Sequence, residues 1–85
     1  MAYTVRYSDQ AYKDLIELNK EVAVRIKKKF IKITNDPLLF VKTLEGVPLY
    51  SLRVGDYRLI LDINLGSKQI LVIKIGRRKN VYKKF

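Results

Sequence analysis

Apolar residues recur at two different spacings along this chain of 85 residues, and the change of spacing divides it into elements. Tyr3 to Tyr7 alternates in the manner of a first strand, and Ser8 or Asp9 offers an N-cap for the helix that follows. Pro37 ends the helical region, because proline disfavours the helical conformation in the residue before it. Two apolar stripes at helical spacing lie between these points and predict two helices with a break near Asn19: Ala11, Leu15 and Leu18, then Val22, Ile26, Phe30 and Ile33.

Three segments rich in strand-forming residues follow at 49–54, 57–63 and 69–76. Gly55-Asp56 fits a two-residue hairpin turn, and a loop at 64–68 joins the last two segments. The order is therefore βααβββ. It predicts an α+β fold with a mostly antiparallel sheet of about four strands and an N-terminal helical hairpin packed on one face. We expect a single domain over residues 1–85, since a chain this short holds one hydrophobic core.

The tight turn also predicts a register. It pairs Arg53 with Arg58, and a five-residue second loop then pairs Arg58 with Lys74. Strand parity gives one apolar face, which we expect the helices to cover: Leu52, Val54, Tyr57, Leu59, Leu61, Ile63, Leu71, Ile73 and Ile75. The other face is open and carries Ser51, Arg53, Arg58, Ile60, Asp62, Ile70, Val72 and Lys74. A row of three cations destabilises a sheet unless an anion binds over it.

The charge balance strengthens the case for an anionic partner. The chain has 18 Lys and Arg against 8 Asp and Glu, a net charge of +10, and the half from residue 37 onward holds most of the excess. Such a field attracts phosphate polyanions, anionic lipids or an acidic protein without choosing among them. The chain has no Cys and no His, so we expect neither a metal site nor a cofactor. Its apolar runs are too short for a signal peptide or a membrane span, which predicts a cytoplasmic protein.

The C-terminal segment 77–85 adds five positive charges and no negative one. Tyr82 lies among these cations. RNA-binding proteins use this combination, because bases stack on aromatic rings while guanidinium groups bind phosphates. We therefore expect RNA contacts from residues of the open face and of this segment: Arg53, Lys74, Arg77 and Lys79.

Three segments together resemble the RelE/ParE superfamily of toxins from type II toxin–antitoxin systems: Leu44-Glu45-Gly46, residues 50–60, and residues 75–82. The most specific parts are Leu-Arg-Val-Gly-Asp-Tyr-Arg at 52–58 and the Gly76-Arg77-Arg78 ending with Val81-Tyr82. The RelE branch is the favoured one. This resemblance implies a ribosome-dependent endoribonuclease that cleaves mRNA in the ribosomal A site and is silenced by an acidic, RelB-like antitoxin.

The same resemblance implies roles for three residues. Arg58 stabilises the charged transition state at the phosphate, Arg78 does the same or protonates the leaving oxygen, and Tyr82 orients or deprotonates the attacking 2′-hydroxyl. The best-known RelE pattern has two lysines on the strand before the Tyr-Arg strand, where this chain has Leu49 and Ser51. The general base is then Lys74 or Tyr82, because the guanidinium of Arg53 hardly ever loses a proton.

Two other functions stay open on the sequence, a ParE-like inhibitor of DNA gyrase and a non-catalytic RNA-binding module. The antitoxin is expected to contact apolar side chains of the open face, for which Ile60, Ile70 and Val72 are the candidates. A partner segment with apolar and acidic residues covers such a surface.

Overall fold

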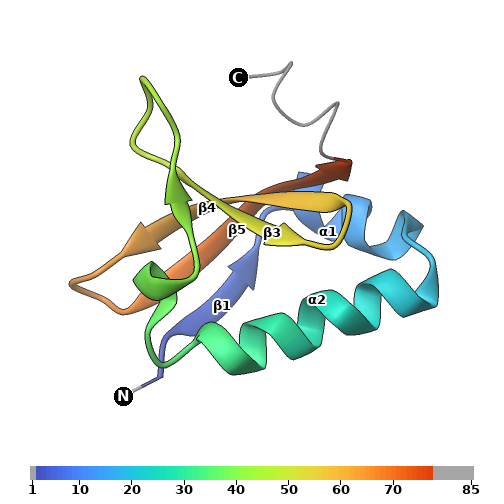
Figure 1. Ribbon diagram of the computed structural model, residues 1–85, viewed down its shortest axis with the longest axis horizontal. Coiled ribbons are helices and arrows are strands. Elements are labelled where there is room, and N and C mark those ends of the chain that lie inside the picture. Colours follow the sequence, from blue (N-terminus) through green and yellow to red (C-terminus); the bar gives the residue numbers. More distant parts are fainter. Residues whose placement is uncertain (1, 78–85) are drawn as a thin grey trace.

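The computed structural model describes residues 2–77 and has a sheet with two helices on one face, which confirms the α+β class (Figure 1). The elements along the chain are β1 (Thr4–Tyr7), α1 (Asp9–Glu17), α2 (Lys20–Ile33), the 3₁₀ turn η1 (Pro37–Leu39), β2 (Lys42–Thr43), β3 (Tyr50–Val54), β4 (Tyr57–Asn64) and β5 (Gln69–Arg77). Within residues 2–77, neither helix is both long enough and apolar enough to cross a membrane.

Polar side chains cap both helices where the sequence pattern changes. The Ser8 hydroxyl accepts a hydrogen bond from the amide of Ala11 at 3.0 Å, and the Asn19 side-chain oxygen accepts one from Val22 at 3.0 Å. Each cap satisfies an amide that has no partner within its own helix. The predicted break near Asn19 is thus the start of α2, and Pro37 begins η1 after the helix has ended.

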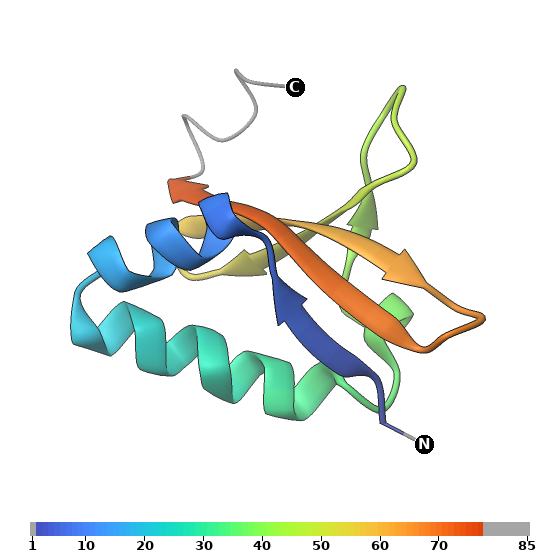
Figure 2. The same ribbon diagram turned by 180° about the vertical axis from the view of Figure 1, so that it is seen from behind.

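Among the described residues the sheet has five strands in the order β1-β5-β4-β3-β2, and β1 runs parallel to β5 (Figure 2). All other neighbours are antiparallel. The prediction of about four strands in the order βααβββ was therefore wrong in detail. It missed β2, a pair of residues bonded to β3, because two residues are too few to give a strand its alternating pattern.

The first hairpin has the predicted register, with Arg53 opposite Arg58 and Leu52 opposite Leu59. Gly55 begins its turn with φ of +58°, a conformation that favours glycine. The second hairpin differs. Asn64 pairs with Gln69 across a four-residue loop, within which the Asn64 side chain accepts a hydrogen bond from the Ser67 amide at 3.0 Å.

The shorter loop and a bulge in β5 each shift the predicted register by one residue. Ile60 pairs with Lys74 but Leu61 pairs with Val72, so Ile73 is an extra residue on β5. Because side chains alternate with a period of two, the shorter loop inverts the predicted facing of residues 69–72, and the extra residue restores it from Lys74 onward. Arg58 therefore lies opposite Gly76, and the predicted pairing of Arg58 with Lys74 was wrong.

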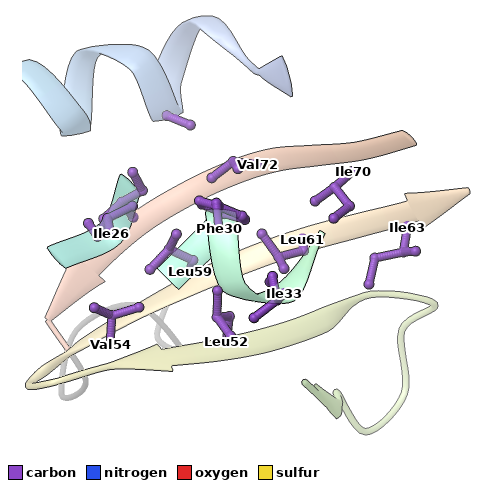
Figure 3. Close-up of a cluster of buried hydrophobic side chains, with 12 residues drawn as sticks. Ile26, Phe30, Ile33, Leu52, Val54, Leu59, Leu61, Ile63, Ile70 and Val72 are labelled. Atoms are coloured by element: carbon purple, nitrogen blue, oxygen red, sulfur yellow. The ribbon is translucent and has the colours of Figure 1, made fainter. Parts of the chain in front are cut away.

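The core beneath the helices shows the same inversion. Ile70 and Val72, predicted on the open face, are fully buried, whereas Leu71, predicted in the core, is 36% exposed. In Figure 3 the side chains of Ile70 and Val72 lie in one cluster with Leu61 and Ile63. Within residues 2–77 the cluster of buried residues beneath the helices consists of Ala11, Ile26, Phe30, Ile33, Leu52, Val54, Leu59, Leu61, Ile63, Ile70, Val72 and Ile75.

Strand β1 closes this core on the side of β5. Val5 and Tyr7 pack against it, and the Tyr7 ring meets Phe30 of α2 edge to face with centroids 6.3 Å apart. Burial raises the pKa of the Tyr7 phenol, since ionisation there would leave a charge poorly solvated. Arg6, between these two residues, has the opposite parity and is exposed on the open face beside Leu71.

Candidate functional site

Two arginines lie directly opposite each other on the open face, Arg53 of β3 and Arg58 of β4. Their side chains bond in different directions. The Arg53 Nε donates to the carbonyl of Gly55 at 3.4 Å, toward the turn, and the Arg58 Nη1 donates to the Ser51 hydroxyl at 3.5 Å, away from the turn. These long contacts separate two like charges that direct pairing would otherwise hold close together.

The next row of the open face runs across four strands. Lys42 of β2 pairs with Ser51, Ser51 pairs with Ile60, and Ile60 pairs with Lys74 of β5. Lys74 therefore remains on the open face, diagonal to Arg58 and at roughly 7–8 Å between Cα atoms. Together, Lys42, Arg53, Arg58 and Lys74 are called the cation cluster below.

Lys42 is a candidate that sequence reasoning missed. Its facing depends on β2, which is too short to be recognised from its residues, and on pairing with Ser51, which follows only from the folded chain. The pairing matters because Ser51 holds one of the positions where the RelE pattern has a lysine. A lysine from the neighbouring strand thus lies beside that position.

The centre of the cation cluster is largely shielded from water. Ser51 is 3% exposed and Ile60 is fully buried, while Arg58 is half-buried with its Nε inaccessible. Ile60 therefore lies on the predicted face of the sheet. Because it is buried, the prediction that it contacts a partner was wrong. Poor solvation strengthens the attraction between a guanidinium and a bound anion, so Arg58 is the cation of the cluster best placed to hold a phosphate tightly.

Of the other predicted site residues, the structure describes only Arg77, which lies away from this group. Arg77 pairs with Tyr57, on the helix side of the sheet, and its guanidinium lies 6.0 Å from the centroid of the Tyr57 ring. Arg78, Lys79 and Tyr82 lie outside the described residues. Leu49 precedes β3 and is half-buried, and its carbonyl accepts a hydrogen bond from the amide of Leu44 at 3.0 Å.

The chemistry available here is that of a phosphate-binding surface. A guanidinium fork can hold two oxygens of a phosphate, and a lysine on either side supplies a compact positive charge and a proton donor. These groups suit a reaction in which negative charge develops on a phosphate.

A model of the family described as ParE toxin of type II toxin-antitoxin system, parDE, matches residues 5–82. The chain belongs to this family, within the RelE/ParE superfamily. The resemblance inferred from residues 44–82 is confirmed.

The relatives place the toxin on the RelE branch. It is 28% identical over 82 residues to the mRNA interferase toxin RelE of Escherichia coli, with 93% of this chain and 86% of that one covered. The toxin–antitoxin complex RelBE2 from Mycobacterium tuberculosis contains a similar chain, with TM-score 0.83 and 26% identity. The match covers 92% of this chain and 100% of that one. The archaeal RelE–RelB complex from Pyrococcus horikoshii contains a chain that is 32% identical to this one, with TM-score 0.79. The match covers 95% of this chain and 100% of that one.

Proposed function

We propose that this toxin is a ribosome-dependent endoribonuclease that cleaves mRNA in the ribosomal A site and thereby inhibits translation. The observation that carries the proposal is the surroundings of Arg58: half-buried, hydrogen-bonded to Ser51, and flanked by Lys42 and Lys74 on the open face. The similarity to an mRNA interferase of Escherichia coli supports the reaction class.

The proposed reaction is attack of a 2′-hydroxyl on the adjacent phosphate. The oxygen loses its proton to a general base, a new P–O bond closes a 2′,3′-cyclic phosphate, and the 5′ oxygen leaves after taking up a proton. Arg58 stabilises the negative charge that builds up on the non-bridging oxygens, which is the largest contribution that a fixed cation makes to such a step. No metal is needed if cations offset this charge and side chains move the protons.

Other residues stabilise charge, transfer protons or bind phosphates in this proposal. Arg78 stabilises the same charge or protonates the leaving oxygen, and Tyr82 orients or deprotonates the 2′-hydroxyl. Lys42 and Lys74 bind the flanking phosphates, and either can serve in proton transfer, because Leu49 and Ser51 stand at the positions of the usual lysines. Arg53, Arg77 and Lys79 add general attraction for RNA.

The proposed partner that silences the toxin is an acidic antitoxin of the RelB type, acting in the cytoplasm. Solved complexes of similar toxins with RelB support this partner. The net charge of +10 favours an acidic segment, and exposed apolar side chains on the helices and η1 offer it contacts: Ile16, Ile31 and Leu39 at 63%, 76% and 75% exposure. These replace the buried Ile60, Ile70 and Val72 as candidate contacts.

The deciding experiment is translation of a defined message in vitro with the purified toxin, followed by mapping of 5′ ends with and without ribosomes. We expect new ends at codon spacing that depend on ribosomes. A mock preparation from cells lacking the toxin controls for contaminating nuclease. An intact message at toxin concentrations that stop growth would exclude the endoribonuclease.

The second candidate is inhibition of DNA gyrase, favoured by the ParE description of the matching family and by Leu49 and Ser51 at the lysine positions. It predicts loss of supercoiling activity in a purified gyrase assay while the message stays intact. Measuring both activities on one preparation separates the two functions.

A further inference from the structure

Strand β5 changes its facing at one residue, Ile73. Before it, Ile70 and Val72 point into the core, and after it, Ile75 does. Had β5 continued without the extra residue, Lys74 would face the helices and Ile73 the open face, because successive side chains alternate. The bulge is therefore what puts Lys74 into the cation cluster, a role that bulges have beside many active sites.

Ser8, the N-cap of α1, and Asp14 in the second turn of this helix hold the bulge. β1 ends at Tyr7, so it does not pair with β5 beyond Val72. Ser8 and Asp14 form the next hydrogen bonds to the backbone of β5. The Ser8 amide donates to the carbonyl of Val72 at 2.9 Å and the Ser8 hydroxyl donates to the carbonyl of Ile73 at 2.8 Å. The Asp14 Oδ2 accepts from the amide of Ile75 at 3.0 Å. These contacts fix the backbone on both sides of Lys74.

The two contacting side chains are themselves held in place. The Ser8 hydroxyl also accepts the amide of Ala11, so one oxygen caps α1 and bonds the bulge at the same time. The Asp14 Oδ1 accepts from the Gln10 side chain at 2.8 Å, which leaves Oδ2 directed at Ile75. Ala11 is fully buried between them, so this turn of α1 is anchored in the core.

We propose that Ser8 and Asp14 are positioning residues: they fix the bulge that turns Lys74 to the open face, where its ammonium group binds an RNA phosphate beside Arg58. The identity of this ligand rests on the proposed function. Asp14 acts through the backbone of β5, on the helix side, and so strengthens RNA binding although it is an acid.

The test is the affinity of the full chain for a 2′-O-methyl RNA oligonucleotide, which cannot be cleaved, measured over a range of salt concentrations. Loss of one lysine–phosphate contact reduces the slope of log affinity against log salt by about one. We expect this reduction in Lys74→Ala and also in Asp14→Ala, with weaker binding in both. Removal of a negative charge by itself would strengthen binding, so the expected sign is opposite to that of simple electrostatics.

Three further variants separate positioning from loss of stability. Asp14→Asn keeps an oxygen that can accept the Ile75 amide, so its slope should match the original chain. Asp14→Ala added to Lys74→Ala should reduce the slope no further. Asn19→Ala removes a comparable cap from α2, away from the bulge, and should leave the slope unchanged while destabilising the fold.

If the slope falls in Lys74→Ala but is unchanged in folded Asp14→Ala, the inference that Asp14 positions Lys74 is overturned. The proposed function is not affected by that result. If the original chain binds no oligonucleotide, this inference is also overturned, whereas the proposed function is decided by the translation assay with ribosomes. Should Asp14→Ala not fold, Ser8→Gly takes its place: glycine is tolerated at an N-cap, and the substitution still removes the bond to Ile73. Its slope should also fall by about one.

Discussion

Neighbouring residues of β4 have opposite surroundings. Leu59 is fully buried beneath the helices with Leu52 opposite it, while Arg58 lies on the other face with Arg53 opposite it. The first pair removes apolar surface from water and stabilises the fold, whereas the second brings two cations together and opposes it. A small domain has little stability to spare, so a face that opposes folding points to selection for binding.

The sharpest way to test the covered face is Leu59→Ala. We expect the free energy of unfolding to fall by about 2–5 kcal/mol, because the truncation leaves a cavity among closely packed side chains. Urea unfolding followed by circular dichroism measures it. Leu71→Ala is the matched control on the open face, where a leucine that is 36% exposed should contribute less than the buried one. Equal losses would contradict the placement of Leu59 in the core and of Leu71 on the open face.

Arg58→Ala tests the open face at its centre. We expect the cleavage rate on programmed ribosomes to fall by roughly 10²–10³, as for loss of one fixed group that stabilises transition-state charge. Arg58→Lys should recover part of the rate, since it keeps the charge but loses the planar fork. Lys28→Ala, an exposed lysine of α2, is the control and should cleave normally. Full activity in a folded Arg58→Ala protein would remove Arg58 from the mechanism.

Lys42→Ala extends the comparison to the edge strand that the sequence did not reveal. Loss of a charge-assisted contact to phosphate, with a contribution of about 1.5 kcal/mol, should lower cleavage about tenfold. Lys32→Ala removes an exposed lysine from α2 and should have little effect. Rates measured at low salt reveal the difference best, because screening weakens exposed charges. Equal effects of both substitutions would mean that only net charge matters.

Arg53→Thr has the smallest expected effect and the opposite sign for stability. The substitution removes the repulsion between Arg53 and Arg58 and introduces threonine, which favours strands more than arginine does. It should therefore raise the free energy of unfolding by about 0.2–1 kcal/mol. RNA affinity should fall at the same time. Paired measurements of urea unfolding and RNA binding check both changes. A loss of stability would show that the bond from Arg53 to Gly55 outweighs the repulsion.

Much of the fold follows from local pattern. The helical stripes, the cap at Asn19 and the Gly55-Asp56 turn lie within a few residues of the contacts they specify, so the register of Arg53 with Arg58 could be read directly. The family resemblance rests on the same hairpin and on the ending at residues 76–82, and it was confirmed.

Tertiary structure decided the rest of the site. The bulge at Ile73 depends on Ser8 and Asp14, which lie 65 and 61 residues from the groups they bond on β5. The place of Lys42 depends on pairing with β3 through a strand of two residues. Neither contact leaves a periodic trace in the sequence, because each is made by single side chains or single residue pairs brought together only when the chain folds. The sequence by itself thus determined which cations are available, and the folded chain determined which of them share one face of the sheet with Arg58.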